Sequence, residues 1–167
     1  MITPFIIAAL TVDGFIARDA SHIALWTSKE DKRRFVELTK RAGVVVMGST
    51  TFKTLPKPLK ERVNIVYSRG STFEGTESAQ QDPVSLIQSL EDRGFSEVAI
   101  CGGASIYSLF LQAKVVKKLY LTVEPLLFGT GISLFNSTLA DTIKLTLISS
   151  STTPTGTVFL EYEVTYL

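Results

Sequence analysis

Short hydrophobic runs alternate along this chain with segments of helical periodicity. The strand-like runs cover residues 4–10, 43–48, 62–68, 96–101 and 117–125. Helical patterns cover residues 28–42, 49–55, 82–94 and 102–113. Strands that are hydrophobic throughout and are separated by helices are typical of a parallel sheet covered on both faces.

The end of the chain has a different pattern. Two further strands, roughly 142–150 and 156–166, are joined around Pro154-Thr155-Gly156, as in an antiparallel hairpin. The most loop-like stretch, 69–82, is short enough to belong within one domain. We therefore predict a single α/β domain over residues 1–167, with a mostly parallel central sheet, helices on both faces and an antiparallel C-terminal edge hairpin.

Composition and net charge exclude several classes of function. The 167 residues carry a formal net charge of +1, which gives no electrostatic argument for binding nucleic acid or an anionic membrane. One cysteine, Cys101, and one histidine, His22, exclude an internal disulfide and a zinc site built from these residue types. The first ten residues lack a basic region and are too short to cross a bilayer, so we expect a cytoplasmic protein without a signal peptide or membrane helix.

One acidic residue lies on the hydrophobic stripe of the first helix. Asp31 aligns with Phe35, Leu38 and Ala42 at i+4, i+7 and i+11, whereas the neighbouring charges fall on the flanks or the far side. An isolated carboxylate in an apolar site has a raised pKa or needs a cationic or hydrogen-bonding partner. Such an acid can recognise a nitrogen base or take part in proton transfer.

Helix capping offers Asp31 an alternative, structural role. Ser28-x-x-Asp31 is a capping box, in which the acid caps the helix. Thr27-x-x-Glu30 is an equally good box one residue earlier. If Thr27 is the cap, Asp31 is free to face a cavity, and from spacing alone both interpretations stand.

Two strand-to-helix turns carry glycine, VVVMGSTTF at 44–52 and AICGGASIY at 99–107. Glycine allows close approach of a bound group, and a helix that follows directs free N–H groups toward phosphate. Neither turn is a GxGxxG or Walker A sequence, and either alone can simply reverse the chain. Arg62 and Arg69 are likewise either surface charges or anion-binding groups.

In combination these segments resemble the dihydrofolate reductase family over nearly the whole chain. The resemblance rests on IIAAL…DGFIA, Trp26 with Asp31 and Phe35, VVVMGSTTF…LPKPL..R.NIVYSR, VAICGGASIY and LYLT, in that order. It implies NADPH-dependent reduction of 7,8-dihydrofolate by hydride transfer to pterin C6 with protonation at N5. It also implies a small-molecule substrate and no metal, and leaves the oligomeric state undetermined.

The resemblance assigns residues to the reaction and to the substrate. Asp31 matches the pocket acid that holds the pterin, Thr122 its hydrogen-bonding threonine, and Trp26 the tryptophan that helps to organise the acid and an ordered water. Arg62 matches the arginine whose guanidinium binds the substrate's α-carboxylate. The implied substrate-pocket walls are Ile7, Ala8, Phe35, Leu55, Leu59, Cys101 and Tyr107.

It also assigns a cofactor site. The two glycine turns match those that cradle the pyrophosphate of NADPH, and residues 11–25 match the family's mobile loop over the site. The implied turn residues are Gly48, Ser49, Thr50, Thr51, Gly102, Gly103, Ala104, Ser105 and Ile106. The other implied cofactor contacts are Ala9, Ile16, Ala17, Ser68, Arg69 and Tyr107.

Three departures from the family pattern stand out. Ser49 and Thr50 replace the arginine and the histidine or threonine that commonly follow MG, so a preference for NADPH must rest on Ser68 and Arg69 or be weaker. Lys32 is a cation where a neutral residue commonly contacts substrate. The stretch EPLLFGTGISLF at 124–135 is more similar to the riboflavin-pathway reductases, which act on a ribosylaminopyrimidine phosphate.

A reductase of that type or another pterin reductase is the alternative enzyme, and a non-catalytic nucleotide-binding module is the alternative outside enzymes.

Overall fold

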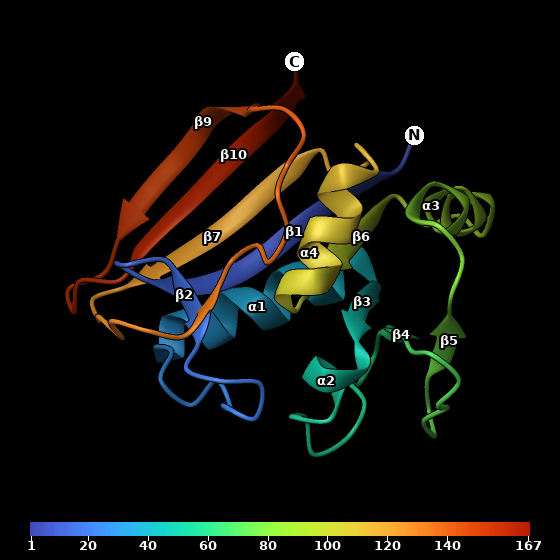
Figure 1. Ribbon diagram of the computed structural model, residues 1–167, viewed down its shortest axis with the longest axis horizontal. Helices are drawn as coiled ribbons and strands as arrows, with labels where there is room; N and C mark the ends of the chain where they lie inside the picture. The colour runs from blue at the N-terminus through green and yellow to red at the C-terminus, as the bar shows by residue number, and fades with distance from the viewer.

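The computed structural model describes all residues from 1 to 167 and is built on one twisted eight-stranded sheet (Figure 1). The strand order is β5-β4-β3-β6-β1-β7-β10-β9. Neighbours from β5 to β7 are parallel, whereas β10 is antiparallel to both β7 and β9. The predicted fold class, including the antiparallel edge hairpin, is confirmed.

Most predicted elements occur close to their predicted bounds. The strands of the large sheet are β1 (Thr3–Thr11), β3 (Val44–Gly48), β4 (Val63–Tyr67), β5 (Glu77–Ala79), β6 (Glu97–Ile100), β7 (Lys118–Glu124), β9 (Ile143–Thr152) and β10 (Val158–Tyr166). The helices are α1 (Lys29–Ala42), α2 (Ser49–Phe52), α3 (Pro83–Asp92) and α4 (Ala104–Gln112). A separate two-stranded sheet pairs β2 (Phe15–Ala17) with β8 (Ile132–Ser133).

The central strands bury both of their faces. In β1, Phe5 and Ile7 belong to the core on the side of α1 and α2, while Ile6 and Ala8 belong to the core on the side of α3 and α4. Successive side chains of a strand point to opposite faces, so one uninterrupted hydrophobic run supplies both cores. β3 divides its four buried residues between the same two cores.

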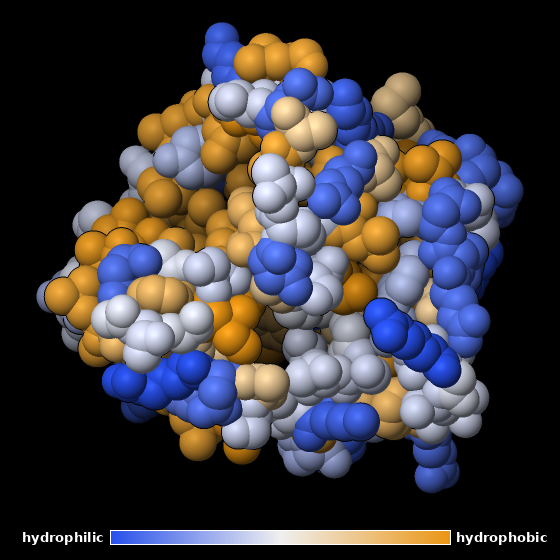
Figure 2. Space-filling view, in the orientation of Figure 1, coloured by the Kyte–Doolittle hydropathy of each residue, from blue (hydrophilic) through white to orange (hydrophobic).

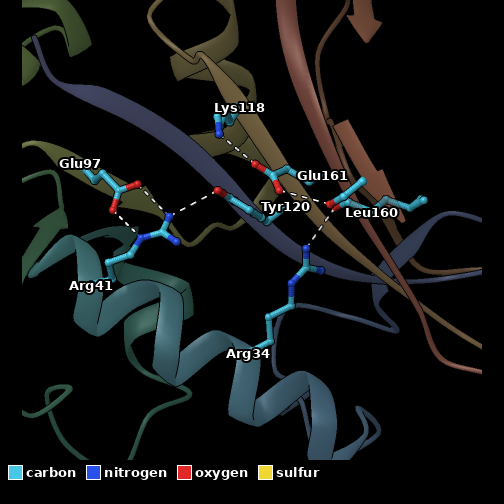
Figure 3. Close-up of polar contacts among 8 residues, drawn as sticks. Arg34, Arg41, Glu97, Lys118, Tyr120, Leu160 and Glu161 are labelled. Atoms are coloured by element: carbon cyan, nitrogen blue, oxygen red, sulfur yellow. Dashed lines mark hydrogen bonds and ion pairs between the residues drawn. The ribbon is translucent and has the colours of Figure 1, made fainter. Parts of the chain in front are cut away.

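Two arginines attach α1 to the sheet (Figure 3). Arg34 donates to the carbonyls of Leu121 in β7 and Leu160 in β10, at 3.1 and 3.3 Å. Arg41 forms a two-pronged ion pair with Glu97 in β6, with both N···O distances 2.7 Å, and its guanidinium also donates to the Tyr120 hydroxyl. These contacts fix the helix against strands from both the parallel and the antiparallel part of the sheet.

Three local features differ from the sequence prediction. Glu77–Ala79, predicted as loop, forms the edge strand β5. α2 ends at Phe52, ahead of the predicted end at residue 55, and the chain continues as turns before Pro56. The β2–β8 sheet was not predicted because strands of three and two residues are too short to show periodicity.

Candidate active site

A cavity opens at the carboxyl edge of the parallel strands, between the N-terminal half of α1 and the turns that follow β3 and β6. It encloses about 410 Å³ and most of its lining is hydrophobic. In Figure 2, hydrophobic atoms are visible in a hollow on the lower half of the face, near the loop that follows β2 and helix α2. The carboxyl edge is where open α/β sheets usually bind ligands.

Asp31 lies in this cavity, in the first turn of α1. Burial raises the pKa of its carboxyl, because the charged form loses hydration. The nearby Thr122 and Thr27 hydroxyls favour the charged form and lower the pKa of Asp31, against the effect of burial. Thr122 is itself buried and does not line the cavity, so it lies on the interior side of the acid.

The capping of α1 differs from the interpretation in which Thr27 is the cap. Ser28 is the N-cap, and its hydroxyl oxygen accepts from the Asp31 N–H at 3.1 Å. In a capping box the acid at the third helical position would accept the N-cap N–H in return. Here Glu124 of β7 accepts that N–H, at 2.7 Å, so the Asp31 carboxyl is free for the cavity although Ser28 is the cap.

Lys32 lines the cavity, but its amine turns back toward the start of the helix. Its Nζ donates to the Thr27 carbonyl at 2.7 Å and to the Thr27 hydroxyl oxygen at 2.9 Å. From the sequence, a possible capping role was the only role assigned to Thr27. In the structure the Thr27 hydroxyl accepts from Lys32 and donates to the Ala24 carbonyl at 3.3 Å.

Trp26 lines the cavity next to the acid. Its indole packs edge-on against Phe128, with ring centroids 5.2 Å apart. The indole N–H is the one buried side-chain donor or acceptor that has no hydrogen-bond partner within the protein. A buried donor without a partner costs free energy, and no group of the protein offsets that cost here.

Arg62 lies at the other end of the cavity from the start of α1. Its Nη1 donates to the Thr39 hydroxyl oxygen at 2.8 Å, and its Nε donates to the Lys60 carbonyl at 2.8 Å. Burial lowers the pKa of the guanidinium, which stays protonated at neutral pH. The arginine is therefore held in place and still has N–H groups for an anion.

The walls between Asp31 and Arg62 are hydrophobic. The predicted wall residues Ile7, Ala8, Phe35, Leu55, Leu59, Cys101 and Tyr107 all line the cavity. Tyr107 is buried and donates to the Ile7 carbonyl at 2.7 Å. Burial raises the pKa of the Cys101 thiol to about 12, so the thiol is neutral. Val36, Met47 and Thr54 also line the cavity and were not predicted. The further lining residues Asp19, Ala20, His22 and Ala24 belong to the loop 11–25 that the resemblance placed over the site.

The two glycine turns lie side by side and form an adjoining hollow of about 920 Å³. The Gly48 N–H donates to the Gly102 carbonyl at 2.8 Å, which joins the turns directly. α4 begins after Gly103 without a side-chain cap, so its first N–H groups remain free. A Cβ on Gly48 would come within 3.2 Å of the Ile106 side chain, so glycine allows this turn to pack closely against the start of α4.

Most predicted cofactor residues line one or both hollows. The larger hollow includes Gly48, Ser49, Thr50, Thr51, Ser68, Arg69, Gly103, Ala104, Ser105 and Ile106. Ala9, Ile16, Ala17 and Tyr107 line the smaller cavity instead, and Gly102 lines neither. Tyr67, Ser71, Ala79, Gln80 and Leu109 complete the larger hollow and were not predicted.

The loop over the cavity is attached to the stretch 124–135. Asp13 accepts from the Phe128 and Gly129 N–H groups, at 3.2 and 2.7 Å. The Arg18 guanidinium lies 4.5 Å from the centre of the Phe128 ring. Gly131 has a φ of +153°, and a Cβ there would lie 2.3 Å from the Ala17 carbonyl oxygen. The unusual stretch is therefore the structural partner of the loop that covers the site.

The described residues contain no group of three or more His, Cys, Asp or Glu side chains that could hold a metal ion. None of the helices combines the length and the hydrophobicity that crossing a membrane requires.

Comparisons with known proteins agree with this geometry. The sequence model of the family described as "Dihydrofolate reductase" matches residues 3–125. Dihydrofolate reductase type 3 from Salmonella typhimurium is 34% identical over 119 residues, covering 70% of this chain and 68% of that protein. The bifunctional dihydrofolate reductase-thymidylate synthase of Plasmodium vinckei is 33% identical over 95 residues, 51% of this chain, and the matched part spans 52% of that relative. The chain belongs to the dihydrofolate reductase family.

Solved structures share the fold at low sequence identity. RibD from Acinetobacter baumannii superposes with a TM-score of 0.83 at 18% identity, covering 99% of this chain and 59% of that one. Dihydrofolate reductase from Enterococcus faecalis, complexed with NADP(H) and RAB-propyl, superposes with a TM-score of 0.77 at 20% identity, covering 98% and 97%. At these identities the likeness shows the fold alone.

Proposed function

We propose that this protein is an NADPH-dependent dihydrofolate reductase. The observation that carries the proposal is the arrangement of charge along one hydrophobic cavity. A carboxyl with a raised pKa, Asp31, lies at one end, and a restrained guanidinium, Arg62, lies at the other. Dihydrofolate has the complementary polarity, with a nitrogen-rich pterin, an aromatic linker and an anionic glutamate.

In the proposed complex the chain's own residues hold and orient the substrate. Asp31 hydrogen-bonds the 2-aminopyrimidine edge of the pterin, and Thr122 and Thr27 orient the carboxyl. The apolar walls, Phe35, Leu55 and Leu59 among them, enclose the benzoyl ring. Arg62 pairs with the α-carboxylate, and its bonds to Thr39 and Lys60 leave the guanidinium little freedom to lose on binding.

The residues at the glycine turns fit NADPH. The free N–H groups at the start of α4, and the backbone of Gly48 and Gly103 in the lining of the same hollow, suit the pyrophosphate. Arg69, beside Ser68 in the same hollow, is the cation available to the 2′-phosphate. Bound NADPH supplies the hydride that reduces C6 of dihydrofolate.

The reaction also consumes one proton at N5, and this is the role proposed for Asp31. Its raised pKa brings the carboxyl closer to neutral pH, where a group can exchange protons efficiently. The hydrophobic lining limits the access of water and strengthens interactions within the cavity. The product is tetrahydrofolate, formed with oxidised cofactor from dihydrofolate, reduced cofactor and a proton.

The riboflavin-pathway type of reductase is the second candidate. The stretch 124–135, which resembles those enzymes, holds the loop over the cavity through Phe128 and Gly131. A substrate of that type, a ribosylaminopyrimidine phosphate, also carries an aminopyrimidine for Asp31 and an anion for Arg62. It lacks the aromatic linker that the hydrophobic walls would enclose.

One assay separates these candidates. The purified protein is supplied with NADPH and either dihydrofolate or the ribosylaminopyrimidine phosphate, and absorbance at 340 nm is followed. Oxidation of NADPH with dihydrofolate supports the proposal. Oxidation with the pyrimidine alone transfers the assignment to the second candidate, and no oxidation with either substrate contradicts both enzyme assignments.

A further inference from the structure

We propose that Asn136 is a positioning residue for the cofactor, which holds the Ser105 hydroxyl so that its hydrogen is directed into the larger hollow, toward the pyrophosphate of NADPH. Asn136 does not line that hollow, whereas Ser105 does. The inference rests on the cofactor site of the proposed function and adds to it a residue from a distant segment of the chain. Binding of the cofactor tests it directly, without turnover.

Asn136 directly follows the stretch 124–135 and lies against the first half of α4. Phe135 and Leu139, on either side of it in the sequence, pack against the hydrophobic core on the side of α3 and α4. The Asn136 N–H donates to the Ser108 hydroxyl oxygen at 3.2 Å. The chain at residue 136 is therefore held against the helix both by hydrophobic contacts and by its own backbone.

Ser108 also determines which way the Asn136 amide faces. Because the Ser108 oxygen accepts the Asn136 N–H, the Ser108 hydroxyl hydrogen is free to donate, and it donates to the Asn136 side-chain oxygen at 3.2 Å. With its oxygen directed at the buried Ser108, the amide presents its nitrogen to Ser105. That nitrogen donates to the Ser105 hydroxyl oxygen at 2.6 Å. The order of donors and acceptors along these three residues is therefore fixed.

This order leaves the Ser105 hydrogen for a ligand. An amide nitrogen donates but does not accept, so Ser105 cannot donate its hydroxyl hydrogen to it. The Asn136 amide is the one hydrogen-bond partner of this hydroxyl within the protein. Ser105 is the second residue of α4 and lines the hollow beside the free N–H groups at the start of that helix. The hydroxyl thereby adds a directed donor to backbone groups that already favour an anion.

A purely structural role for Asn136 would be to attach its loop to α4. The same loop has a second attachment at the other end of the helix. There the Gln112 side chain donates to the Ser137 hydroxyl oxygen at 3.0 Å and to the Thr138 carbonyl at 3.4 Å. Gln112 does not line the cofactor hollow. Because only the Asn136 attachment contacts a residue of the hollow, Gln112 provides the matched control.

The test is calorimetric titration of NADPH into the purified protein without substrate. Asn136→Ala should raise the Kd for NADPH about 3- to 10-fold, and Ser105→Ala should raise it about 5- to 20-fold, since a donor to a charged phosphate is weakened or lost. Asn136→Asp should weaken binding more than Asn136→Ala, because a carboxylate would accept the Ser105 hydrogen and would repel the pyrophosphate. Gln112→Ala should leave the Kd unchanged.

Two further measurements isolate the route through the hydroxyl. In a Ser105→Ala background, Asn136→Ala should add little to the Kd for NADPH, because the hydroxyl through which it acts is already missing. Adenosine 2′-phosphate, which has no pyrophosphate, should bind the wild type and Asn136→Ala equally. Ser105 is exposed, so Ser105→Ala tests the inference even if substitutions of Asn136 fold poorly, and an unchanged Kd for that variant would overturn it.

An unchanged Kd for Asn136→Ala, an equal loss for Gln112→Ala, or losses that add for Asn136→Ala and Ser105→Ala would also overturn the inference. A wild-type protein that does not bind NADPH would overturn it together with the proposed cofactor. If the losses occur as described but dihydrofolate is not reduced, the proposed function fails and this inference stands.

Discussion

Ser28 and Glu124 are 96 residues apart in the sequence, yet two hydrogen bonds join them. The N-cap of α1 is thereby fixed to the end of β7, the strand that also carries Thr122. The distance between the Asp31 carboxyl and its threonine partner thus depends on a tertiary contact as well as on the helix. This arrangement leads to predictions about the acid, the two arginines that contact ligands in the proposed complex, and the arginine that holds the helix.

Replacement of the acid should abolish most turnover. For Asp31→Asn we expect kcat with dihydrofolate at pH 7 to fall by about 100-fold or more, because the amide cannot supply a proton to the substrate. The measurement is NADPH oxidation at saturating substrate. A variant with wild-type kcat would remove Asp31 from the reaction.

The same variant should not be less stable at neutral pH. Burial raises the pKa of Asp31, so the native state binds the proton more tightly than the unfolded chain does. The favourable contribution is therefore complete at pH below the ordinary aspartate range and is lost as pH rises through the raised pKa. Thermal melts should give Asp31→Asn a midpoint equal to or above that of the wild type at pH 7. This difference should shrink toward pH 4, and a difference that grows on acidification would contradict the sign.

Arg62→Leu should weaken binding of the glutamate-bearing substrate. Loss of a charged hydrogen-bonding group is expected to raise the KM for dihydrofolate by about 10- to 100-fold. The KM for 7,8-dihydropterin, which has no glutamate, should stay unchanged. Arg33→Leu, at an exposed position of α1, is the matched control. Equal increases for both substrates would show that the arginine acts on the pocket as a whole.

Arg69→Ala should affect the choice of cofactor. If its guanidinium binds the 2′-phosphate, the KM for NADPH should rise about tenfold while the KM for NADH changes little. Steady-state kinetics with the two cofactors give the ratio directly. An unchanged ratio would place the 2′-phosphate elsewhere in the hollow.

Arg34→Ala should destabilise the fold more than its surface position on a helix implies. The change leaves the Leu121 and Leu160 carbonyls without their donor, and it also removes stacking on Phe159, whose ring centre lies 4.8 Å from the guanidinium. We expect the free energy of unfolding to fall by about 2 kcal/mol in urea titrations. Arg34→Lys should lower the free energy of unfolding by less. Arg41→Ala removes an ion pair near the surface and should lower the free energy of unfolding by about 1 kcal/mol or less.

The sequence predicted the inward position of Asp31 correctly because helical spacing is a local property. It predicted the wrong reason for the acid's freedom, since no local pattern links Ser28 to Glu124. A signal for Glu124 was nevertheless present: it follows Thr122 by two residues in a strand, so both side chains share a face. The β2–β8 sheet and the edge strand β5 were not predictable, because their pairing depends on loops that the rest of the fold positions.

The hydrogen bond from the Gly48 N–H to the Gly102 carbonyl has a consequence for local opening. It joins the two glycine turns into a single unit, since neither can move away from the other without breaking that bond. In amide hydrogen exchange, the Gly48 amide should therefore be protected to a degree that neighbouring turn amides do not reach. Its exchange rate then reports how often the ends of β3 and β6 separate in the native state, with or without a ligand between them.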